Sequence, residues 1–204
     1  ADNGNIALTG QIDLEACEGK FTIALSFGSR MEEAAIQVRT SLMRGFDAAL
    51  EEYIAGWREA QSHTTVLKEV DKEGGSLAKI SYAVLKTHQG KHFTGSVIAS
   101  LSIPWGTHRG DHDLGGYHLI WPRDQVQTAN AFLAVNDYDS ARQAFIFLMA
   151  TQEADGHFPQ NMWDDGKSYW SKVQLDETAL PILLAGELRK VNYLKKVFPF
   201  DFVR

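Results

Sequence analysis

Two short segments of the chain combine the side chains that a sugar-binding site needs. The first, residues 115–124, holds two aromatic rings, a guanidinium and a carboxylate just before an apolar helical stretch: Tyr117, Trp121, Arg123 and Asp124. Aromatic rings offer flat apolar surfaces to a sugar ring, while charged groups hydrogen-bond to its hydroxyls. The second, residues 169–177, repeats this combination before another apolar helical stretch: Trp170, Gln174, Asp176 and Glu177. Two such segments in the same relation to a helix start predict a carbohydrate site.

The two aspartates have a competing structural role. Asp124 and Asp176 each stand where a helix is expected to begin, and Asp is a favoured N-cap residue. On the residues alone, simple helix capping explains both. The two roles are compatible, because a capping carboxylate keeps lone pairs that can accept a hydrogen bond from a sugar hydroxyl.

The tryptophans and the arginine also have alternative roles. Trp121 and Trp170 could each belong to a hydrophobic core, but both stand in polar loop sequences, which favours contact with a ligand. Arg123 could form a surface ion pair. Because it is flanked by Trp121 and Asp124, it is better placed for bidentate hydrogen bonding to a ligand.

Neither segment supplies a suitable pair of catalytic carboxylates. An inverting glycosidase needs two carboxyl groups roughly 6.5–9.5 Å apart, one protonated and one activating water. Asp176 and Glu177 are neighbours at a helix start, so their side chains diverge. We interpret Glu177 as a helix-start charge or a group that supports the site, with a general-acid role as the minor alternative. No catalytic residue is assigned within this chain.

Composition and motifs argue against several other classes of protein. The formal net charge of −6 and the pI near 5.6 provide no basic face for nucleic acid. No apolar run approaches the length of a membrane span. The sequence has neither a glycine-rich phosphate loop nor the Gly-x-Ser-x-Gly elbow of serine hydrolases. No cofactor is expected.

One loop contains a group of potential metal ligands: His108, Asp111, His112, Asp113 and His118. Their spacing matches no standard zinc pattern, and no cysteine lies nearby to complete one. A solvated loop is the better interpretation. Residues 164–166, Asp-Asp-Gly, could supply calcium oxygens, yet a plain turn explains them equally well.

The pattern of apolar residues changes from strand-like to helical along the N-terminal part of the chain. Two alternating stretches, 6–14 and 20–27, are typical of strands joined by a turn at residues 18–19. Because two strands alone are marginal, they need a larger sheet that this chain lacks. Over residues 31–57 apolar positions recur at helical spacing, which predicts one long amphipathic helix suited to a connector.

The rest of the chain predicts helices joined by long loops. Helical patterns cover residues 76–88, 122–135, 139–153 and 177–190, and no strand pattern separates them. Asp139 is expected to cap the third of these helices. The fold class is therefore mainly α, with loops long enough to carry function.

At these segments the sequence resembles bacterial glucoamylases and glucodextranases of glycoside hydrolase family 15. The resemblance runs from about residue 20 onwards and is most specific at residues 102–106, 115–124 and 156–177. Members of this family have a β-sandwich domain, a helical linker and an (α/α)6 barrel whose inner-helix ends form the active site. The resemblance therefore implies a partial (α/α)6 barrel preceded by a helical linker and the terminal strands of a β-sandwich.

The family's first motif, Tyr-x-x-x-Trp-x-Arg-Asp, falls on residues 117–124 of this chain. The resemblance implies that Arg123 and Asp124 hold hydroxyl groups of the terminal glucose. It also implies that Tyr117 and Trp121 line the pocket beside the bond that is cleaved.

The family's second motif, Trp-x-x-x-Gln-x-Asp, falls on residues 170–176. The resemblance implies that Trp170 packs beside the catalytic acid and the substrate, while Gln174 and Asp176 support the site. The family's general acid, in a Trp-Glu-Glu segment further downstream, and its later general base have no counterpart in this sequence. We therefore expect a fragment that holds half of the glucose pocket and neither catalytic carboxylate.

The same resemblance predicts three regions. Residues 1–29 would be the last strands of the β-sandwich, 30–60 the helical linker and 61–204 the first part of the catalytic barrel. An incomplete barrel should expose apolar inner faces, and the residues expected there are Ala179, Leu183 and Phe145. Such a chain should persist together with the remainder of its own polypeptide or by self-association.

The expected function is exo-acting, inverting hydrolysis of α-glucosidic bonds, which releases glucose from the non-reducing ends of starch- or dextran-like glucans. The expected partner is an α-glucan oligosaccharide or polysaccharide, and this substrate class favours a secreted or periplasmic location. One alternative is a non-catalytic carbohydrate-binding or assembly protein. Another is a different (α/α)6 glycosidase or a phosphorylase.

Overall fold

The computed structural model describes residues 9–68, 74–101 and 117–194 and divides the chain into two compact units, Ala1–Ser62 and His63–Arg204. The first unit contains α1 (Met31–Arg44) and α2 (Phe46–Ser62). The second contains the short 3-10 helix η2, four α-helices and two strands: η2 (His63–Leu67), α3 (Ser76–Thr87), α4 (Pro122–Ala134), α5 (Tyr138–Ala150), β1 (Asn161–Met162), β2 (Ser168–Trp170) and α6 (Leu175–Lys190). This content confirms the mainly α fold class. No helix in the described ranges is long and apolar enough to span a membrane.

Within the described residues 9–28, the strands predicted at the N-terminus are not formed. Residues 9–28 follow an irregular course around one turn, and apolar side chains such as Ile23 and Leu25 are 74% and 72% exposed. The turn itself is where the sequence indicates it, with Glu18 and Gly19 at positive φ. Strands need partners for their backbone groups, and the described part of this unit provides no sheet edge for them.

The single long helix predicted over residues 31–57 is broken at Gly45. There the backbone turns to φ 85° and ψ 153°, while the Gly45 N–H still donates to the carbonyl groups of Ser41 and Leu42. Residues with a side chain rarely adopt this φ, so glycine permits the break. The chain then resumes as α2, and neither α1 nor α2 contains a buried residue.

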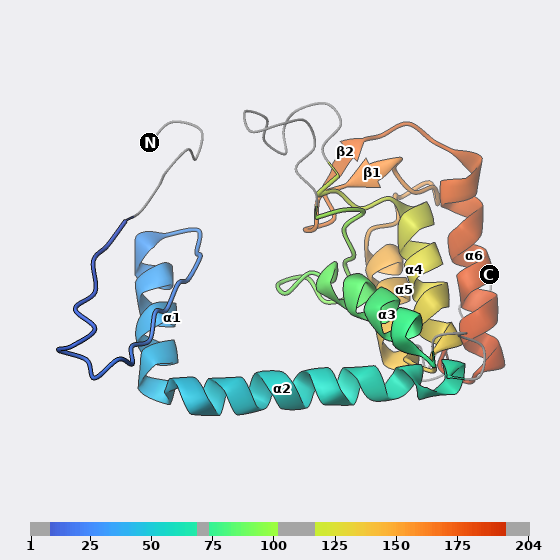
Figure 1. The fold of residues 1–204 in the computed structure, drawn as a ribbon. Coiled ribbons are helices and arrows are strands. Elements are labelled where there is room, and N and C mark those ends of the chain that lie inside the picture. The colour runs from blue at the N-terminus through green and yellow to red at the C-terminus, as the bar shows by residue number, and fades with distance from the viewer. Residues whose placement is uncertain (1–8, 69–73, 102–116, 195–204) are drawn as a thin grey trace. The chain divides into compact units, whose positions relative to one another are not determined.

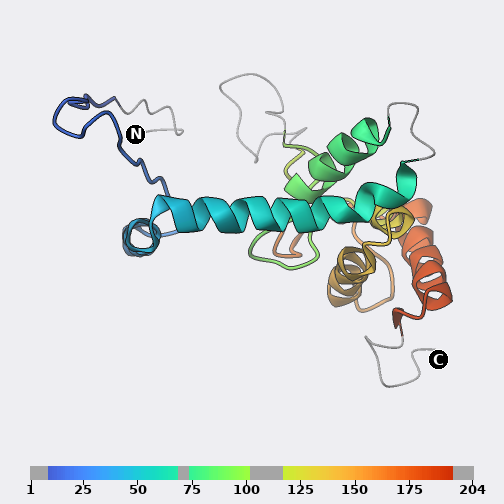
Figure 2. The ribbon, with the colours of Figure 1, turned by 60° about the horizontal axis from the view of Figure 1, so that its bottom comes forward.

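All four helices predicted for the second unit are present, with ends close to those expected. Helices α4, α5 and α6 pack against one another (Figures 1 and 2). The first turns of α4 and α6 lie at the same end of this bundle, beside the strands (Figure 1). Side chains of the three helices form its core, and the fully buried ones include Val126, Ala129, Phe132, Ala141, Ala144, Leu148, Leu184 and Leu188.

The apolar patch predicted on this unit is only partly correct. Phe145 is 4% exposed and belongs to the core, because α5 is covered by both of its neighbours. Leu183, in contrast, is 63% exposed. Together with Leu175 and Ile182 it gives α6 an exposed apolar stripe, while Ala179 is half-buried.

A short antiparallel hairpin, which the sequence pattern did not indicate, lies between α5 and α6. Strand β1 pairs with β2, with Asn161 opposite Trp170. Ile120, just before α4, exchanges two backbone hydrogen bonds with Met162 of β1, at 2.8 and 2.9 Å. Residues 164–166 form the tight turn between the strands, so the turn interpretation of this run is correct. The hairpin thereby joins the two segments that predict the site.

Helix α5 is capped by Asp137, so the prediction of Asp139 as its cap is wrong. Asp137 accepts a hydrogen bond from the Ser140 N–H at 3.2 Å, whereas Asp139 already lies inside the helix. The other carboxylate oxygen of Asp137 accepts the Tyr82 hydroxyl at 2.6 Å and lies 3.5 Å from the Lys86 ammonium. Burial opposes ionisation of Asp137, but these hydrogen bonds and the Lys86 charge hold its pKa below the ordinary value.

Replacing Tyr82 by Phe should lower the free energy of unfolding by about 1–3 kcal/mol at neutral pH, because a buried carboxylate loses a hydrogen bond while the ring is kept. The effect should shrink as pH falls through the pKa of Asp137, since protonation removes the charge that the hydroxyl stabilises. Tyr138→Phe is the matched control, because the Tyr138 hydroxyl bonds to the exposed Asn136. Urea unfolding measures both variants, and equal losses would contradict the account.

Candidate functional site

The candidate site is organised around the first turn of α4. Trp121 is the N-cap residue, with extended backbone angles and no side-chain hydrogen bond to the helix, and Pro122 occupies the first helical position. Proline suits this position because its φ is preset and it has no N–H to satisfy. The next donor, the N–H of Arg123, has no acceptor within the helix. It needs one from elsewhere in the fold.

Glu177 of α6 supplies that acceptor. The Arg123 N–H donates to Glu177 Oε2 at 2.5 Å, and Glu177 Oε1 lies 3.4 Å from Arg123 Nη1. The Glu177 residue is fully buried. A carboxylate at this position is favoured by the free N–H groups and by the positive end of the helix dipole. A side chain 54 residues away in the sequence therefore caps α4.

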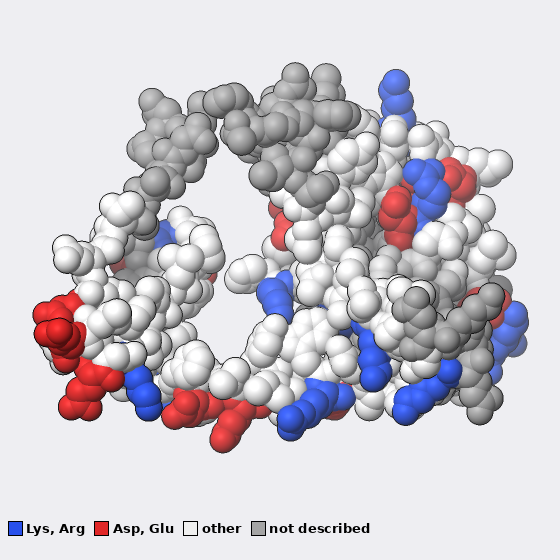
Figure 3. Space-filling model, viewed as in Figure 1, with Lys and Arg blue, Asp and Glu red and all other residues white. Residues whose placement is uncertain are grey.

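The Arg123 guanidinium lies among three carboxylates. Its Nη1 donates to Asp176 Oδ2 at 2.6 Å, and its Nε lies 3.9 Å from Asp124 Oδ2. The side chains of Arg123, Asp124 and Asp176 are 42%, 50% and 45% exposed, so all three reach solvent while Glu177 does not. Figure 3 shows basic and acidic groups against one another at this end of α4 and α6. The arrangement offers donors and acceptors side by side at the surface.

The pKa values of Asp176 and Glu177 are shifted in opposite directions. The hydrogen bond from Arg123 holds the pKa of Asp176 below its ordinary value, and the same bond raises the pKa of Arg123. Burial raises the pKa of Glu177 to about 7, although the hydrogen bond and charge of Arg123 act in the opposite direction. Asp176 therefore remains ionised at neutral pH, whereas Glu177 titrates near it.

Simple N-capping does not explain the two aspartates. The N-cap residues are Trp121 and Gln174, while Asp124 and Asp176 lie within the first turns of α4 and α6. Acidic side chains are favoured there by the helix dipole. The capping alternative is thus replaced by a surface cluster in which Asp176 binds Arg123 directly.

The aromatic rings of the first segment lie close to each other. The rings of Tyr117 and Trp121 have centroids 5.8 Å apart and planes tilted by 30°. Tyr117 is 44% exposed and Trp121 only 9%. Trp121 is therefore a core residue that also packs against the Tyr117 ring. The Tyr117 ring is the one that faces solvent.

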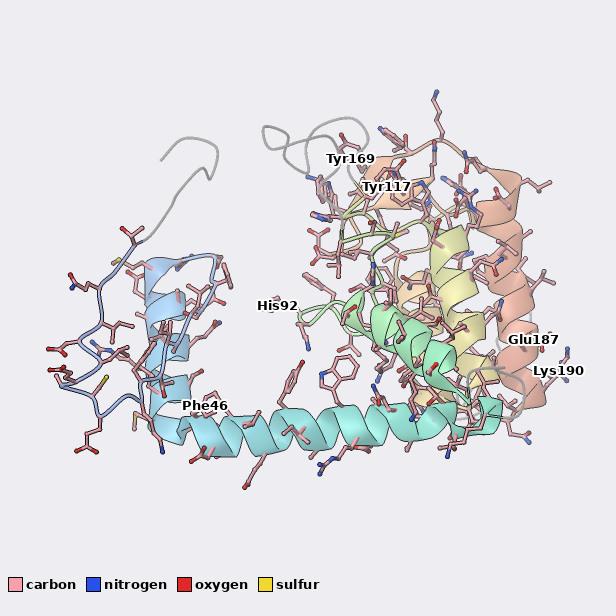
Figure 4. The ribbon with its side chains drawn as sticks, in the orientation of Figure 1. Phe46, His92, Tyr117, Tyr169, Glu187 and Lys190 are labelled. Carbon is pink, nitrogen blue, oxygen red and sulfur yellow. The ribbon has the colours of Figure 1, made fainter. Side chains whose placement is uncertain are left out.

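The aromatic residues of the second segment are held by the hairpin. The backbone N–H of Trp170 donates to the side-chain oxygen of the fully buried Asn161 at 2.9 Å. The Trp170 ring lies 5.6 Å from that of Tyr169, which meets Trp163 edge-on at 5.3 Å. Tyr117 and Tyr169 both lie at the hairpin end of the unit (Figure 4). Sequence reasoning did not assign Asn161 or Trp163 to the site, because their link to Trp170 depends on the hairpin.

Polar atoms with unused hydrogen-bonding capacity gather at the start of α6. Gln174 Oε1, Glu177 Oε1 and Thr178 Oγ1 are buried and have no hydrogen-bond partner within the ranges that the structure describes. Buried polar atoms in folded proteins ordinarily have partners. This end of α6 can therefore accept further hydrogen bonds.

Other predicted features fall partly outside the structure. The motif at residues 102–106 and four of the potential metal ligands, His108, Asp111, His112 and Asp113, lie outside the described residues. Among the residues that are described, no three His, Cys, Asp or Glu side chains form a group that could hold a metal ion.

Comparison with known proteins gives consistent similarities along the chain. Residues 1–62 match the family described as glucodextranase, domain N, and residues 75–195 match glycosyl hydrolases family 15. A glucoamylase from Clostridium sp. (strain G0005) is 40% identical over 202 residues, which cover 98% of this chain and 28% of that protein. The chain thus spans well under a third of this relative's length.

A solved structure shows the same likeness in three dimensions. It is the crystal structure of a bacterial glucoamylase in complex with acarbose, which matches with a TM-score of 0.68 and 38% sequence identity. The match covers 82% of this chain and 24% of the glucoamylase chain. This likeness confirms the prediction of a partial helical barrel.

The burial of Glu177 predicts a specific pH dependence of stability. Since the folded-state pKa of about 7 lies above the ordinary value of 4.5, ionisation destabilises the folded chain. Relative to Glu177→Gln, the wild-type free energy of unfolding should therefore fall as pH rises from 4.5 to 7 and then level off. Urea titrations across this range measure it, with Glu187→Gln, an exposed glutamate of α6, as control. A wild-type advantage that grows with pH would contradict the prediction.

Proposed function

Because the chain belongs to glycosyl hydrolase family 15, we propose that it forms the glucose-binding part of an exo-acting, inverting α-glucoside hydrolase. The complete protein would release glucose from the non-reducing ends of starch- or dextran-like glucans. The observation that carries this proposal is the surface cluster of Arg123, Asp124 and Asp176 at the hairpin end, with the exposed ring of Tyr117 also at that end. Family membership does not favour a non-catalytic binding protein or a phosphorylase.

The charged cluster matches the hydrogen-bonding needs of a terminal sugar. Each sugar hydroxyl both donates and accepts, so neighbouring hydroxyls are best met by a donor and an acceptor side by side. Arg123 has five N–H donors and directs one to Asp176, which leaves others for a ligand. Asp124 presents carboxylate oxygens next to them. In this proposal Arg123 and Asp124 bind adjacent hydroxyls, while Asp176 holds the guanidinium in place.

The aromatic groups would supply the apolar part of the pocket. Tyr117 has the exposure that packing on a sugar face requires, whereas Trp121 contributes mainly by supporting the Tyr117 ring. Trp170 would close the pocket from the hairpin side, with its backbone held by the hydrogen bond to Asn161. Gln174, with a buried side-chain oxygen that has no hydrogen-bond partner in the described chain, would support this side of the pocket.

We place the catalytic carboxylates outside this chain. A pKa near 7 would suit a general acid, which makes Glu177 the natural candidate here. A general acid must, however, reach the glycosidic oxygen. Glu177 is fully buried, and one of its oxygens is bound to the Arg123 N–H. Geometry therefore favours a supporting role, and the acid and base would come from the remainder of the polypeptide.

We propose the same three regions that the sequence predicts: 1–29, 30–60 and 61–204. The division of the structure after Ser62 and the start of the family 15 match at residue 75 support the second boundary. The remainder of the polypeptide is the proposed partner of the second unit. The exposed apolar stripe of Leu175, Ile182 and Leu183 on α6 supports this, because such a stripe is stable when another surface covers it.

Replacing Arg123 by Lys should weaken maltose binding by about tenfold, the effect of one charge-assisted hydrogen bond. Lysine keeps the charge but cannot bind Asp176 and a sugar hydroxyl with one planar fork. Arg142→Lys is the matched control, because Arg142 pairs with Asp139 on α5 at 3.1 Å. Isothermal titration calorimetry with maltose measures both variants, and equal affinities would count against the proposed role of Arg123.

The purified 204-residue chain should release no glucose from maltose, because we place both catalytic carboxylates in the remainder of the polypeptide. The same chain joined to the remainder of a family 15 protein should release glucose whose first-formed anomer is β, as inversion requires. Proton NMR distinguishes the anomers before they equilibrate. Glucose release by the isolated chain that disappears in Glu177→Gln would make Glu177 the acid and overturn this assignment.

A further inference from the structure

The side chain of Glu177 is the contact through which the first turns of α4 and α6 hold each other. One oxygen accepts the Arg123 N–H, and the other faces the Arg123 guanidinium at 3.4 Å. The same arginine is thus held at its backbone and at its side chain by one carboxylate. The exposed members of the cluster, Asp124 and Asp176, are direct sequence neighbours of these two residues.

Both first turns lack some of the hydrogen bonds that ordinarily stabilise the start of a helix. Helix α4 has no side-chain cap from its own N-cap residue, Trp121. Helix α6 contains Pro181, which has no N–H to donate to the carbonyl of Glu177 and whose ring crowds that carbonyl. Because the local hydrogen bonds are incomplete, the orientation of both turns depends more strongly on the contact between them.

We propose that Glu177 is a positioning residue for sugar binding, which from its buried site fixes the Arg123 backbone and guanidinium and so sets the direction in which Arg123 and Asp124 meet the ligand. The inference rests on the proposed function, because it assigns Glu177 a role in that same site. Glu177 itself does not contact the sugar, since it is fully buried behind the exposed cluster.

The charge of Glu177 matters as well as its shape. A neutral side chain at this position can still accept the Arg123 N–H, but it no longer attracts the guanidinium. The guanidinium would then be held by the half-exposed Asp176, with Asp124 as a competing partner. These three residues are the charged groups facing Glu177 from the described parts of α4 and α6. Loss of the buried charge should therefore let the Arg123 side chain take other orientations.

The test compares three variants of the full 204-residue chain. Glu177→Gln keeps the shape and removes the charge, and Glu177→Asp keeps the charge and shortens the reach. Glu187→Gln is the matched control, because Glu187 pairs with Lys190 at the opposite end of α6 from the cluster (Figure 4). Two readouts are taken on each: the dissociation constant for maltose by calorimetry, and the NMR signals of the Arg123 amide and Nε–H groups.

At pH 8, Glu177→Gln should bind maltose about tenfold more weakly than wild type, and its Arg123 amide signal should move upfield as the strong acceptor is lost. Glu177→Asp should recover part of the affinity. Wild-type affinity should itself decline from pH 8 to 5.5, as the Glu177 carboxylate becomes protonated, while the affinity of the Gln variant stays constant. The control should match wild type in every respect. A residue with a merely structural role would produce no such pH profile.

Wild-type affinity and unchanged Arg123 signals in Glu177→Gln would overturn the proposal. If wild type itself binds no maltose at any pH, the proposed function fails, and the NMR signals then decide the positioning role alone. Retained Arg123 signals in the Gln variant would refute that role, and their shift or broadening would support it. If the Gln variant does not fold, Glu177→Asp is tested in its place. Weaker maltose binding with shifted Arg123 signals would then support the proposal, and wild-type affinity with unchanged signals would overturn it.

Discussion

The short hydrogen bond between the Glu177 carboxylate and the Arg123 N–H is the contact on which the arrangement of the site depends. It is the point at which two helices, far apart in sequence, meet at their first turns. Because Pro122 and Trp121 leave α4 without a cap of its own, the N–H of Arg123 would otherwise be an unsatisfied donor next to the core. The acceptor comes from α6, and this fixes the relative positions of Arg123 and Asp176.

The same contact explains why Glu177 is buried while the carboxylates of the surface cluster, Asp124 and Asp176, are exposed. Burial of a charged group is unfavourable unless a hydrogen bond and an opposite charge accompany it. Arg123 supplies both to Glu177, and the balance leaves the pKa of Glu177 raised to about 7. Asp124 and Asp176 stay half-exposed, so their oxygens remain available to solvent and to a ligand. In the proposed function, the buried Glu177 positions Arg123, and the half-exposed groups bind the sugar.

Helices α3 to α6 could be predicted from the sequence because each carries its own apolar periodicity and packs by it. The positions of helix breaks and helix caps were less predictable. Gly45 interrupts a helix whose apolar pattern continues across it, and Asp137 and Asp139 are equally good caps by residue type. The hairpin strands are too short to show alternation, so the link between Asn161 and Trp170 has no signal in the sequence.

The residues of the candidate site were recognisable from their types and motif spacing, but their interactions were not. Asp124 and Asp176 were equally consistent with capping, and only the packing of α4 on α6 shows Asp176 bound to Arg123. Glu177 stands next to Asp176 in the sequence, yet burial gives the two carboxylates opposite pKa shifts. Properties that depend on contacts between distant segments required the fold.

The most direct measurement is an NMR titration of the chain with maltose, with cellobiose as the β-linked comparison. The account predicts that maltose shifts amide signals within residues 117–124 and 169–177, and that cellobiose shifts them less. Maltose-induced shifts confined to other parts of the chain would contradict the assignment of the site, as would equal responses to both sugars.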